Sequence, residues 1–341
     1  MKRNLYIIIT IVFSIILLSS CSETSHYHRY EGFTQGGTFH VIYSDINSNT
    51  GNKIQIGLSE IEDTLISITN YIENTFSGYN QASLLSQINH NTTDIPNNIF
   101  IELFNISKNL WVETDGLFDI SGAPLYDAWG FGFANKIPVD QHIIDSLLCF
   151  VGMDKLDIIN NKVVKKDPRV ELNFNAIAQG YTADLIGKKL EVFGITDYLV
   201  DVGMEIYCKG HNSSDKKWQI GIDKPIDGSL EAGKNIQDIL EVTNVGIVTS
   251  GNYRKFYYKD GKKIVHTINP TTGKPAVSNL LSATVIAKNS TIADAYATYC
   301  MTLGLEKAKE FLNSRDDLDG YLIYSEDSRF HVYSTMGNNR Q

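Results

Sequence analysis

Two residues near the C-terminal end of the chain, Asp294 and Thr298, have the side chains and the spacing to hold a metal ion. They are four positions apart, so on a helix their side chains share one face. Ala293, Ala297 and Met301 are apolar and favour burial of that face, and a buried carboxylate must be paired or bound to a metal. Carboxylate, hydroxyl and carbonyl oxygens suit Mg²⁺. In the alternative interpretation, Asp294 only caps the start of the helix and Thr298 packs normally.

A glycine turn rich in hydroxyl groups, residues 249–254, and a histidine, His266, precede this pair in the chain. Backbone N–H groups beside glycine can approach an anion closely. Ser250 and Gly251 are therefore candidates for contacting a phosphate, and Arg254 could add a charge-assisted hydrogen bond. His266 lies at the end of a predicted strand, where loops often carry function, although a lone histidine is more often structural than catalytic. Together these residues predict metal-assisted chemistry on a nucleotide pyrophosphate.

Four other segments combine glycine with polar or aromatic residues and could complete such a site. The glycines of residues 32–38 could let the backbone approach an anion, and residues 76–80 offer turn residues and an aromatic face for a ring system. Residues 115–132 could wall a planar ligand, with Asp119 as a buried acceptor. Residues 172–181 predict a strand followed by a helix, whose free N–H groups could seat a phosphate. Each segment could equally be an ordinary turn or a packed loop.

The predicted helices and strands favour an α+β fold. Hydrophobic periodicity predicts helices over about 57–75, 99–110, 178–193 and 292–312, the last with a break near Gly304. Strand-like runs occur at 39–43, 170–174, 198–202, 218–222, 240–243, 281–287, 321–324 and 330–333. Asp260-Gly261 between two further runs predicts a hairpin. Helices and strands do not alternate regularly, which argues against a Rossmann or barrel fold. We expect one large domain of mixed sheets and helices, with two lobes as an alternative organisation.

The composition is that of a globular protein. Hydrophobic residues make up 43% of the chain, and the net charge of −9 comes without a basic stripe, which argues against a nucleic-acid partner. The cysteines beyond Cys21 are Cys149, Cys208 and Cys300. Their odd number and wide spacing indicate neither a disulfide framework nor a zinc site, so each is expected to be a buried thiol.

The N-terminal residues predict a lipoprotein signal peptide. A short positive start precedes the apolar run 5–18, which is shorter than the roughly 20 residues of a spanning helix. Leu18-Ser19-Ser20-Cys21 resembles a bacterial lipobox, so Cys21 is the expected lipidation site; an ordinary secretory signal is the alternative. We expect a signal peptide over 1–20, a polar tether over 21–30, a catalytic domain over 31–337, and an extracytoplasmic, membrane-anchored location at the periplasmic face of a cell membrane.

In their order along the chain, these motifs resemble those of the ApbE family, the FAD:protein FMN transferases. The resemblance runs from about Gly32 to Thr335 and is carried by TQGGTFHV, FSGYN, GLFDISGAPLYDAWGFG, LNFNAIAQGYTAD, YLVDVGMEI, WQIGIDKP, VTSGNYR, HTINPTTGKP and ADAYAT. It implies an ApbE-like fold and a Mg²⁺-dependent transfer of FMN from FAD to a Thr or Ser hydroxyl of an acceptor protein, with release of AMP.

The resemblance also implies partners and site residues. Acceptors in the family are subunits of membrane redox pumps, such as Rnf-type complexes and the sodium-pumping NADH:quinone reductase. Asp294, Thr298 and the carbonyl of Ala176 would hold the metal, with Ala297 adjacent. His266, with Asp294 as a rival, would accept the proton of the acceptor hydroxyl. FAD would contact Gln35, Ser77, Gly78, Tyr79, Asp119, Gln179, Ser250, Gly251, Arg254 and Asn279.

Two positions depart from the family pattern. Gln179 stands where lysine is usual, which removes a charge, and Met204 stands where a second glycine is common, which adds a side chain beside the expected site. Two other functions stay open: an FAD pyrophosphatase that gives FMN and AMP, and a lipoprotein that binds flavin without chemistry. The pair of Asp294 and Thr298 argues against the second, because a pure binder needs no metal at the pyrophosphate.

Overall fold

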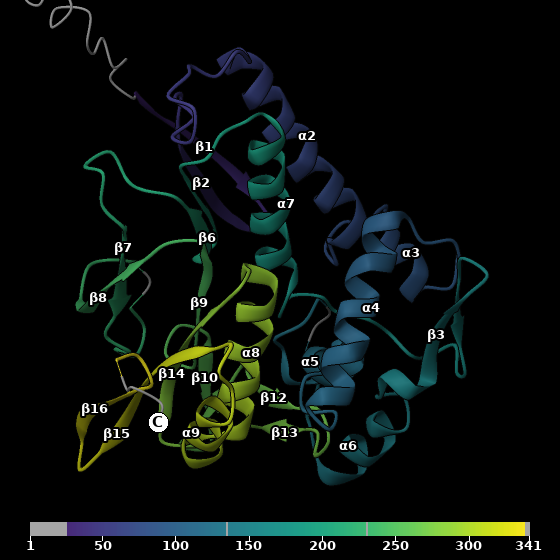
Figure 1. Ribbon diagram of the computed structural model, residues 1–341. Helices are drawn as coiled ribbons and strands as arrows, with labels where there is room; N and C mark the ends of the chain where they lie inside the picture. Colours follow the sequence, from purple (N-terminus) through teal and green to yellow (C-terminus); the bar gives the residue numbers. More distant parts are fainter. Residues whose placement is uncertain (1–25, 134–135, 230, 338–341) are drawn as a thin grey trace, which may run out of the picture.

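The computed structural model describes residues 26–133, 136–229 and 231–337, and one large antiparallel sheet organises it (Figure 1). Strands from both ends of the chain meet in this sheet, and each pairs antiparallel with its neighbours. The order across the sheet is β1 (Tyr27–Thr34), β2 (Gly37–Ser44), β5 (Tyr198–Val202), β6 (Glu205–Lys209), β9 (Val245–Gly251), β14 (Leu280–Ala287), β15 (Asp319–Glu326) and β16 (Arg329–Ser334).

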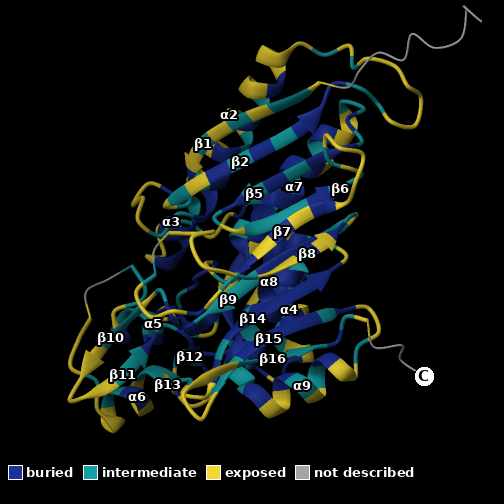
Figure 2. Ribbon diagram, turned by 90° about the vertical axis from the view of Figure 1, so that its left-hand side faces the viewer, coloured by how far each residue is buried: buried dark blue, intermediate teal, exposed yellow. Residues whose placement is uncertain are grey.

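The two faces of the sheet are covered differently (Figure 2). On one face lie α7 (Ala178–Val192) and α8 (Ser290–Leu303), which α9 (Leu305–Asn313) follows. Apolar residues of α7 pack there on Val41 and Val202. On the other face, the hairpin of β7 (Trp218–Asp223) and β8 (Ile236–Val242) packs on Ile247 and Ile286. Successive side chains along a strand point to opposite faces of the sheet, so both faces of the central strands are buried.

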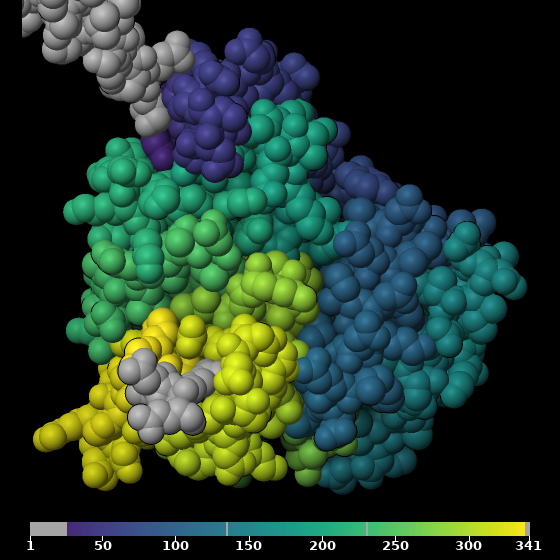
Figure 3. Space-filling model, viewed as in Figure 1, coloured from purple at the N-terminus to yellow at the C-terminus, as the bar shows by residue number. Residues whose placement is uncertain are grey.

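A mainly helical part lies beside α7 and α8 (Figures 1 and 3). Asn97 caps its helix Asn98–Glu113 by accepting a hydrogen bond from the Phe100 N–H at 2.9 Å. The elements of this part and the small hairpins are α2 (Leu58–Phe76), α3 (Leu84–Asn89), α4 (Asn98–Glu113), α5 (Ala123–Trp129), α6 (Gln141–Leu148), β3 (Leu156–Ile159), β4 (Lys162–Lys165), β10 (Phe256–Lys259), β11 (Lys262–Val265), β12 (Ile268–Asn269) and β13 (Lys274–Pro275), with 3₁₀ turns at Ile120–Gly122 and Met153–Lys155.

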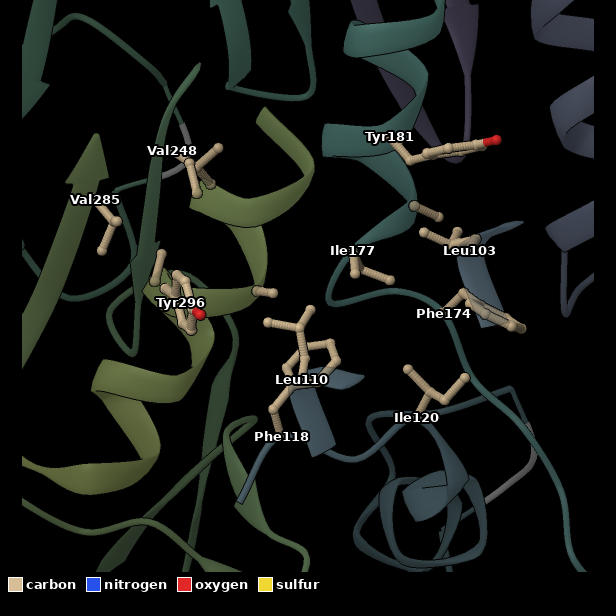
Figure 4. Packing of buried hydrophobic residues seen from close by; sticks show 14 of the residues in the cluster. Leu103, Leu110, Phe118, Ile120, Phe174, Ile177, Tyr181, Val248, Val285 and Tyr296 are labelled. Carbon is tan, nitrogen blue, oxygen red and sulfur yellow. The ribbon is translucent and has the colours of Figure 1, made fainter. Parts of the chain in front are cut away.

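One hydrophobic core joins the sheet to the helical part. It runs from Val248 and Val285 on the sheet, through Tyr296 on α8, to Leu103 and Leu110 on α4 (Figure 4). A continuous core is the mark of one cooperative domain. The structure therefore agrees with the expected single large α+β domain.

Most of the elements that hydrophobic periodicity predicts are present. In α2, Ile61, Leu65 and Ile72 are buried, as their spacing predicts. Gly304, with a φ of 77°, ends α8 and separates it from α9, which confirms the expected break. The hairpin at Asp260-Gly261 forms between β10 and β11.

Three expectations were wrong. Residues 170–174 are no strand, because their polar groups have other partners: Asn89 exchanges hydrogen bonds with Leu172, and the Asn173 N–H donates to the Ile120 carbonyl. The expected tether over 21–30 extends too far, because Tyr27 already begins β1. Cys208 and Cys300 are buried, but Cys149 is exposed.

The signal peptide over 1–20 and Cys21 lie outside the described residues. Among the helices of the described residues, none combines the length and the hydropathy that crossing a membrane requires.

Candidate active site

Two side chains fix the start of α8. Asn289 caps the helix by accepting from the Ile292 N–H at 3.0 Å. Asp184, a buried residue of α7, accepts from the Ser290 N–H at 2.8 Å and the Thr291 N–H at 2.9 Å, and the Thr291 hydroxyl also donates to it. The first N–H groups of a helix have no partner within it. Their capture by Asp184 therefore holds α8 in one axial position against α7.

Asp294 lies one turn further along α8 and faces the start of α7. The Gly180 N–H donates to its Oδ2 at 3.2 Å. A Cβ atom on Gly180 would come within 2.5 Å of the Ser290 carbonyl oxygen and 2.9 Å of the Asp294 Cβ, so only glycine allows this approach. The structure thus brings together the predicted carboxylate and the predicted helix start, where free N–H groups favour anions.

The environment of Asp294 suits a cation. The residue is 4% exposed, and burial raises its pKa to about 7; the Gly180 N–H opposes this shift and the Asp184 carboxylate adds to it. A buried carboxylate is stable when it carries a proton or faces a positive charge. A divalent cation would displace that proton.

Thr298 completes a set of hard oxygen donors. It lies one turn beyond Asp294, and its hydroxyl oxygen is 3.3 Å from the Ser250 hydroxyl on β9. Ala297 is fully buried beside it, and Ala176 lies in the turn before α7. Carboxylate, hydroxyl and carbonyl oxygens fit Mg²⁺. The described residues contain no metal-binding group of three or more His, Cys, Asp and Glu, so an ion here would need hydroxyl or backbone oxygens in addition to carboxylates.

Gln179, Met204 and Arg254 meet at the turn between β5 and β6. The Gln179 amide nitrogen packs against Gly203, where an added Cβ would come within 2.2 Å of it. Met204 has a left-handed φ of 88°, which costs a residue with a side chain roughly 1–2 kcal/mol, and its Sδ contacts Arg254 Nη1. Arg254 Nη2 donates to Asp223 Oδ2 at 2.7 Å. Asp223, for which the sequence predicts no role, therefore orients this guanidinium.

Gln35 lies at the tip of the hairpin of β1 and β2. It forms a two-residue turn with Gly36, and both have a positive φ, of 50° and 76°. The Gln35 N–H donates to Glu73 on α2, and its side-chain oxygen accepts from the Thr182 hydroxyl on α7 at 2.9 Å. The hairpin tip therefore lies at the N-terminal half of α7, next to the turn that contains Gly203.

Ser77, Gly78 and Tyr79 follow α2 directly. Tyr79 is 72% exposed, and its ring lies edge-on to Phe133 with 5.0 Å between centroids. A Cβ on Gly78 would overlap the Phe133 ring. The Ser83 hydroxyl donates to the Ser77 carbonyl at 2.6 Å and fixes the loop. The segment presents one open aromatic face, and its role toward a planar ligand stays a prediction.

Asp119 is the buried acceptor that the sequence predicts. Its Oδ1 accepts from the Ser121 N–H at 2.7 Å and from the Ser121 hydroxyl at 2.5 Å. Burial raises the pKa of Asp119 to about 6, although the bonds from Ser121 oppose this shift. The Asn173 N–H donates to the Ile120 carbonyl at 2.7 Å. This bond ties the Asp119 segment to the turn that enters α7.

His266 directly follows β11, as predicted, and its ring has a defined tautomer. Its Nδ1 lies 3.2 Å from the Lys255 carbonyl oxygen. A carbonyl oxygen only accepts, so Nδ1 carries the proton and Nε2 keeps a free lone pair. Burial, and then the charge of Lys255, lower the pKa of His266 to about 4, against the effect of the hydrogen bond to the Lys255 carbonyl. The imidazole is therefore neutral at physiological pH and can accept a proton.

Asn279 is less clearly part of this arrangement. Its side chain donates to the Ser325 carbonyl at 3.3 Å, away from the glycine turn. It directly precedes β14, whose Ser282 pairs with Gly251, so only the strand brings it near the other residues. Two surface cavities, one beside Lys165 and one beside Asp45, contain none of the predicted site residues.

Comparison with known proteins identifies relatives of this chain. The model of the ApbE family matches residues 38–322. A protein of Haemophilus influenzae (strain ATCC 51907 / DSM 11121 / KW20 / Rd) named FAD:protein FMN transferase is 31% identical over 346 residues, which cover 98% of this chain and 97% of that protein. A protein of the same name from Escherichia coli (strain K12) is 34% identical over 267 residues, or 75% of this chain and 74% of that one. The solved structure of the flavin transferase ApbE from Vibrio cholerae has a TM-score of 0.79 at 26% identity and covers 92% of this chain and 98% of its own.

The chain belongs to the ApbE family. It is a transferase, and its α+β fold is that of the solved flavin transferases of this family. The predicted family, fold class and enzyme class are thereby confirmed.

Proposed function

We propose that this chain is an FAD:protein FMN transferase that uses Mg²⁺ to move the FMN half of FAD onto a Thr or Ser hydroxyl of an acceptor protein, with release of AMP. The observation that carries the proposal is the buried Asp294, which accepts from the Gly180 N–H at the start of α7 and lies one turn from Thr298. A helix start can receive the oxygens of a pyrophosphate, and oxygen ligands can hold the hard cation that accompanies it. Relatives named FAD:protein FMN transferase that match nearly the whole chain support the same function.

The residues fit the proposed ligands as follows. Asp294, Thr298 and the Ala176 carbonyl would hold Mg²⁺, with Ala297 packed beside them. Bound there, Mg²⁺ supplies charge neutralisation at the pyrophosphate and stabilises AMP as the leaving group. The N–H groups at the start of α7 would receive phosphate oxygens, and Arg254, oriented by Asp223, would donate a charge-assisted bond. The remaining contacts with FAD would come from Gln35, Ser77, Gly78, Tyr79, Asp119, Gln179, Ser250, Gly251 and Asn279.

His266 would act as the general base. The acceptor oxygen forms a bond to the phosphorus of the FMN half while the bond from that phosphorus to the bridging oxygen breaks, and the electron pair leaves with AMP. The proton of the acceptor hydroxyl goes to the free Nε2 of His266. Positioning and charge dominate such transfers, so the role of the base is to remove the proton as the new bond forms.

Replacing His266 by alanine is expected to lower FMN transfer roughly 10²–10⁴-fold, because general-base help is worth about that much. Its pKa of about 4 keeps the base neutral above that pH, so the acid limb that His266 sets should lie near pH 4 and not near 6.5. Transfer rates measured from pH 4 to 9 check both effects. His331→Ala, on β16, is the control, and an unchanged rate in His266→Ala would remove the assignment.

The proposed function is tested with purified residues 22–341, FAD, Mg²⁺ and an acceptor domain that bears the target threonine. In-gel flavin fluorescence and the acceptor mass are read with and without chelator. We expect an FMN adduct on the acceptor that the chelator abolishes. Free FMN and AMP without an adduct would favour the pyrophosphatase, and intact FAD would favour a protein that only binds flavin.

We further propose that Cys21 is lipidated and anchors the protein at the outer, periplasmic face of a cell membrane. The support is the order of positive start, apolar run and cysteine in residues 1–21. This position would give access to a redox-pump subunit, of the Rnf type or of the sodium-pumping NADH:quinone reductase, as the acceptor.

A further inference from the structure

Glu205 lies on the same side of the sheet as Asp294. It begins β6, where it pairs with Val202 on β5 and with Val248 on β9. Residues paired directly across antiparallel strands point to the same face. Val248 packs in the core cluster that includes residues of α8 (Figure 4). The Glu205 side chain therefore lies on the face of the sheet that α8 covers.

The carboxylate of Glu205 has an oxygen without a partner. Among the described residues, Glu205 Oε2 is buried and has no hydrogen-bond partner. It lies at Gly203, where an added Cβ would come within 3.1 Å of Oε2 and within 2.2 Å of the Gln179 amide nitrogen. The carboxylate thus meets the start of α7. An unpaired buried carboxylate oxygen is costly in a native protein and calls for a partner.

The charges around Glu205 are mainly negative. After burial, Asp294 and then Asp201 are the strongest causes that raise the pKa of Glu205 well above its ordinary range, and a hydrogen bond from the Glu205 backbone N–H and then Lys255 oppose them. Gln179, where lysine is usual in the family, is uncharged and does not neutralise the Glu205 carboxylate. Carboxylates that a strand and a helix bring to one site repel each other when both are ionised, and a cation between them relieves this repulsion.

We propose that Glu205 is a second carboxylate of the cation site and binds from the sheet the same ion that Asp294 and Thr298 bind from α8. The inference rests on the proposed function, because it places a cation at Asp294. A second carboxylate adds a negative charge to the site, and affinity for a divalent cation rises with the charge of its ligands. It also gives the buried Oε2 of Glu205 its missing partner.

The test measures binding of Mn²⁺, which stands in for Mg²⁺ and is followed by electron paramagnetic resonance. The wild-type protein and Glu205→Gln are titrated with the metal alone and again with FAD present. Glutamine keeps the size of the side chain and removes its charge, so we expect Mn²⁺ affinity to fall about 10–100-fold. The matched control is Glu191→Gln on α7, whose carboxylate binds the Tyr198 hydroxyl and Lys209 instead. This control should bind Mn²⁺ as the wild type does.

The outcomes separate this inference from the proposed function. Weaker Mn²⁺ binding in Glu205→Gln, with Glu191→Gln unchanged, supports a second carboxylate. Wild-type Mn²⁺ affinity in Glu205→Gln, together with lost binding in Asp294→Asn, overturns the role of Glu205 and leaves the proposed function intact. Weaker FAD binding at unchanged Mn²⁺ affinity also overturns it, because Glu205 would then contact the nucleotide. No Mn²⁺ binding by the wild type, with or without FAD, overturns both.

Discussion

Asparagine in place of Asp294 should remove most FMN transfer while the protein stays folded and at least as stable as before. Asparagine keeps an oxygen that can accept from the Gly180 N–H, but it loses the negative charge that would bind the cation. The cation contributes several kcal/mol to the reaction, so we expect a loss of about 10³-fold or more in rate.

The stability of Asp294→Asn should change in the opposite direction. Burial raises the pKa of Asp294 from 3.8 to about 7, so ionising the carboxyl destabilises the folded state increasingly as the pH rises from about 4 to 7. Asparagine removes this cost, and the gain should disappear below pH 4, where the carboxyl is protonated in both states.

Transfer assays and urea denaturation at pH 4 and pH 8, without metal, check both parts of this expectation. Thr298→Ser keeps a hydroxyl ligand and serves as the control. Transfer by Asp294→Asn at more than a tenth of the wild-type rate would contradict the metal role.

Alanine in place of Gly180 should damage both the stability and the activity. Its Cβ would lie 2.5 Å from the Ser290 carbonyl oxygen and 2.8 Å from the Ser290 carbonyl carbon. These are backbone atoms, and Asp184 holds Ser290 in place, so the two helices must separate. Overpacking of this kind costs about 1–3 kcal/mol, and a displacement of about 1 Å at the site can cost about 10²-fold in rate.

Gly221→Ala provides the matched control, because the neighbours of an added Cβ there lie at 3.4 Å or further. Urea denaturation gives the free energy of unfolding of both variants, and the transfer assay gives their rates. If Gly180→Ala matched Gly221→Ala in both, the close packing of α7 on α8 would not position the site.

The helices could be predicted because their signal is local. In α2 and α4 the buried side chains recur at helical spacing, and in α8 the left-handed Gly304 ends the pattern. The strand β9 was missed, because its sequence V-G-I-V-T-S-G places glycine where the backbone of Asn289 and Ser290 approaches within 2.3 Å of an added Cβ. Glycine is required there by the start of α8, which is distant in the sequence. A local sequence pattern therefore does not reveal the requirement.

The same distinction between local and long-range signals applies to the site. Asp294 and Thr298 could be found, because both lie on one helix at a spacing that any helix brings together. Asp184, Glu205 and Asp223 lie in segments that carry the family resemblance, but no role was predicted for them. Their partners are remote in sequence: the start of α8, the Asp294 carboxylate and Arg254. Their roles depend on which helices and strands pack together, and the sequence alone does not show that packing.

The early start of β1 limits how far the enzyme can stand from a bilayer. β1 begins at Tyr27, only six positions after Cys21. With Cys21 as the proposed anchor, a fully extended connection spans at most about 20 Å, whereas a tether to residue 30 would span about 30 Å. With that anchor, the enzyme would be held close to the lipid, and it would modify only a threonine that the acceptor presents near the membrane surface.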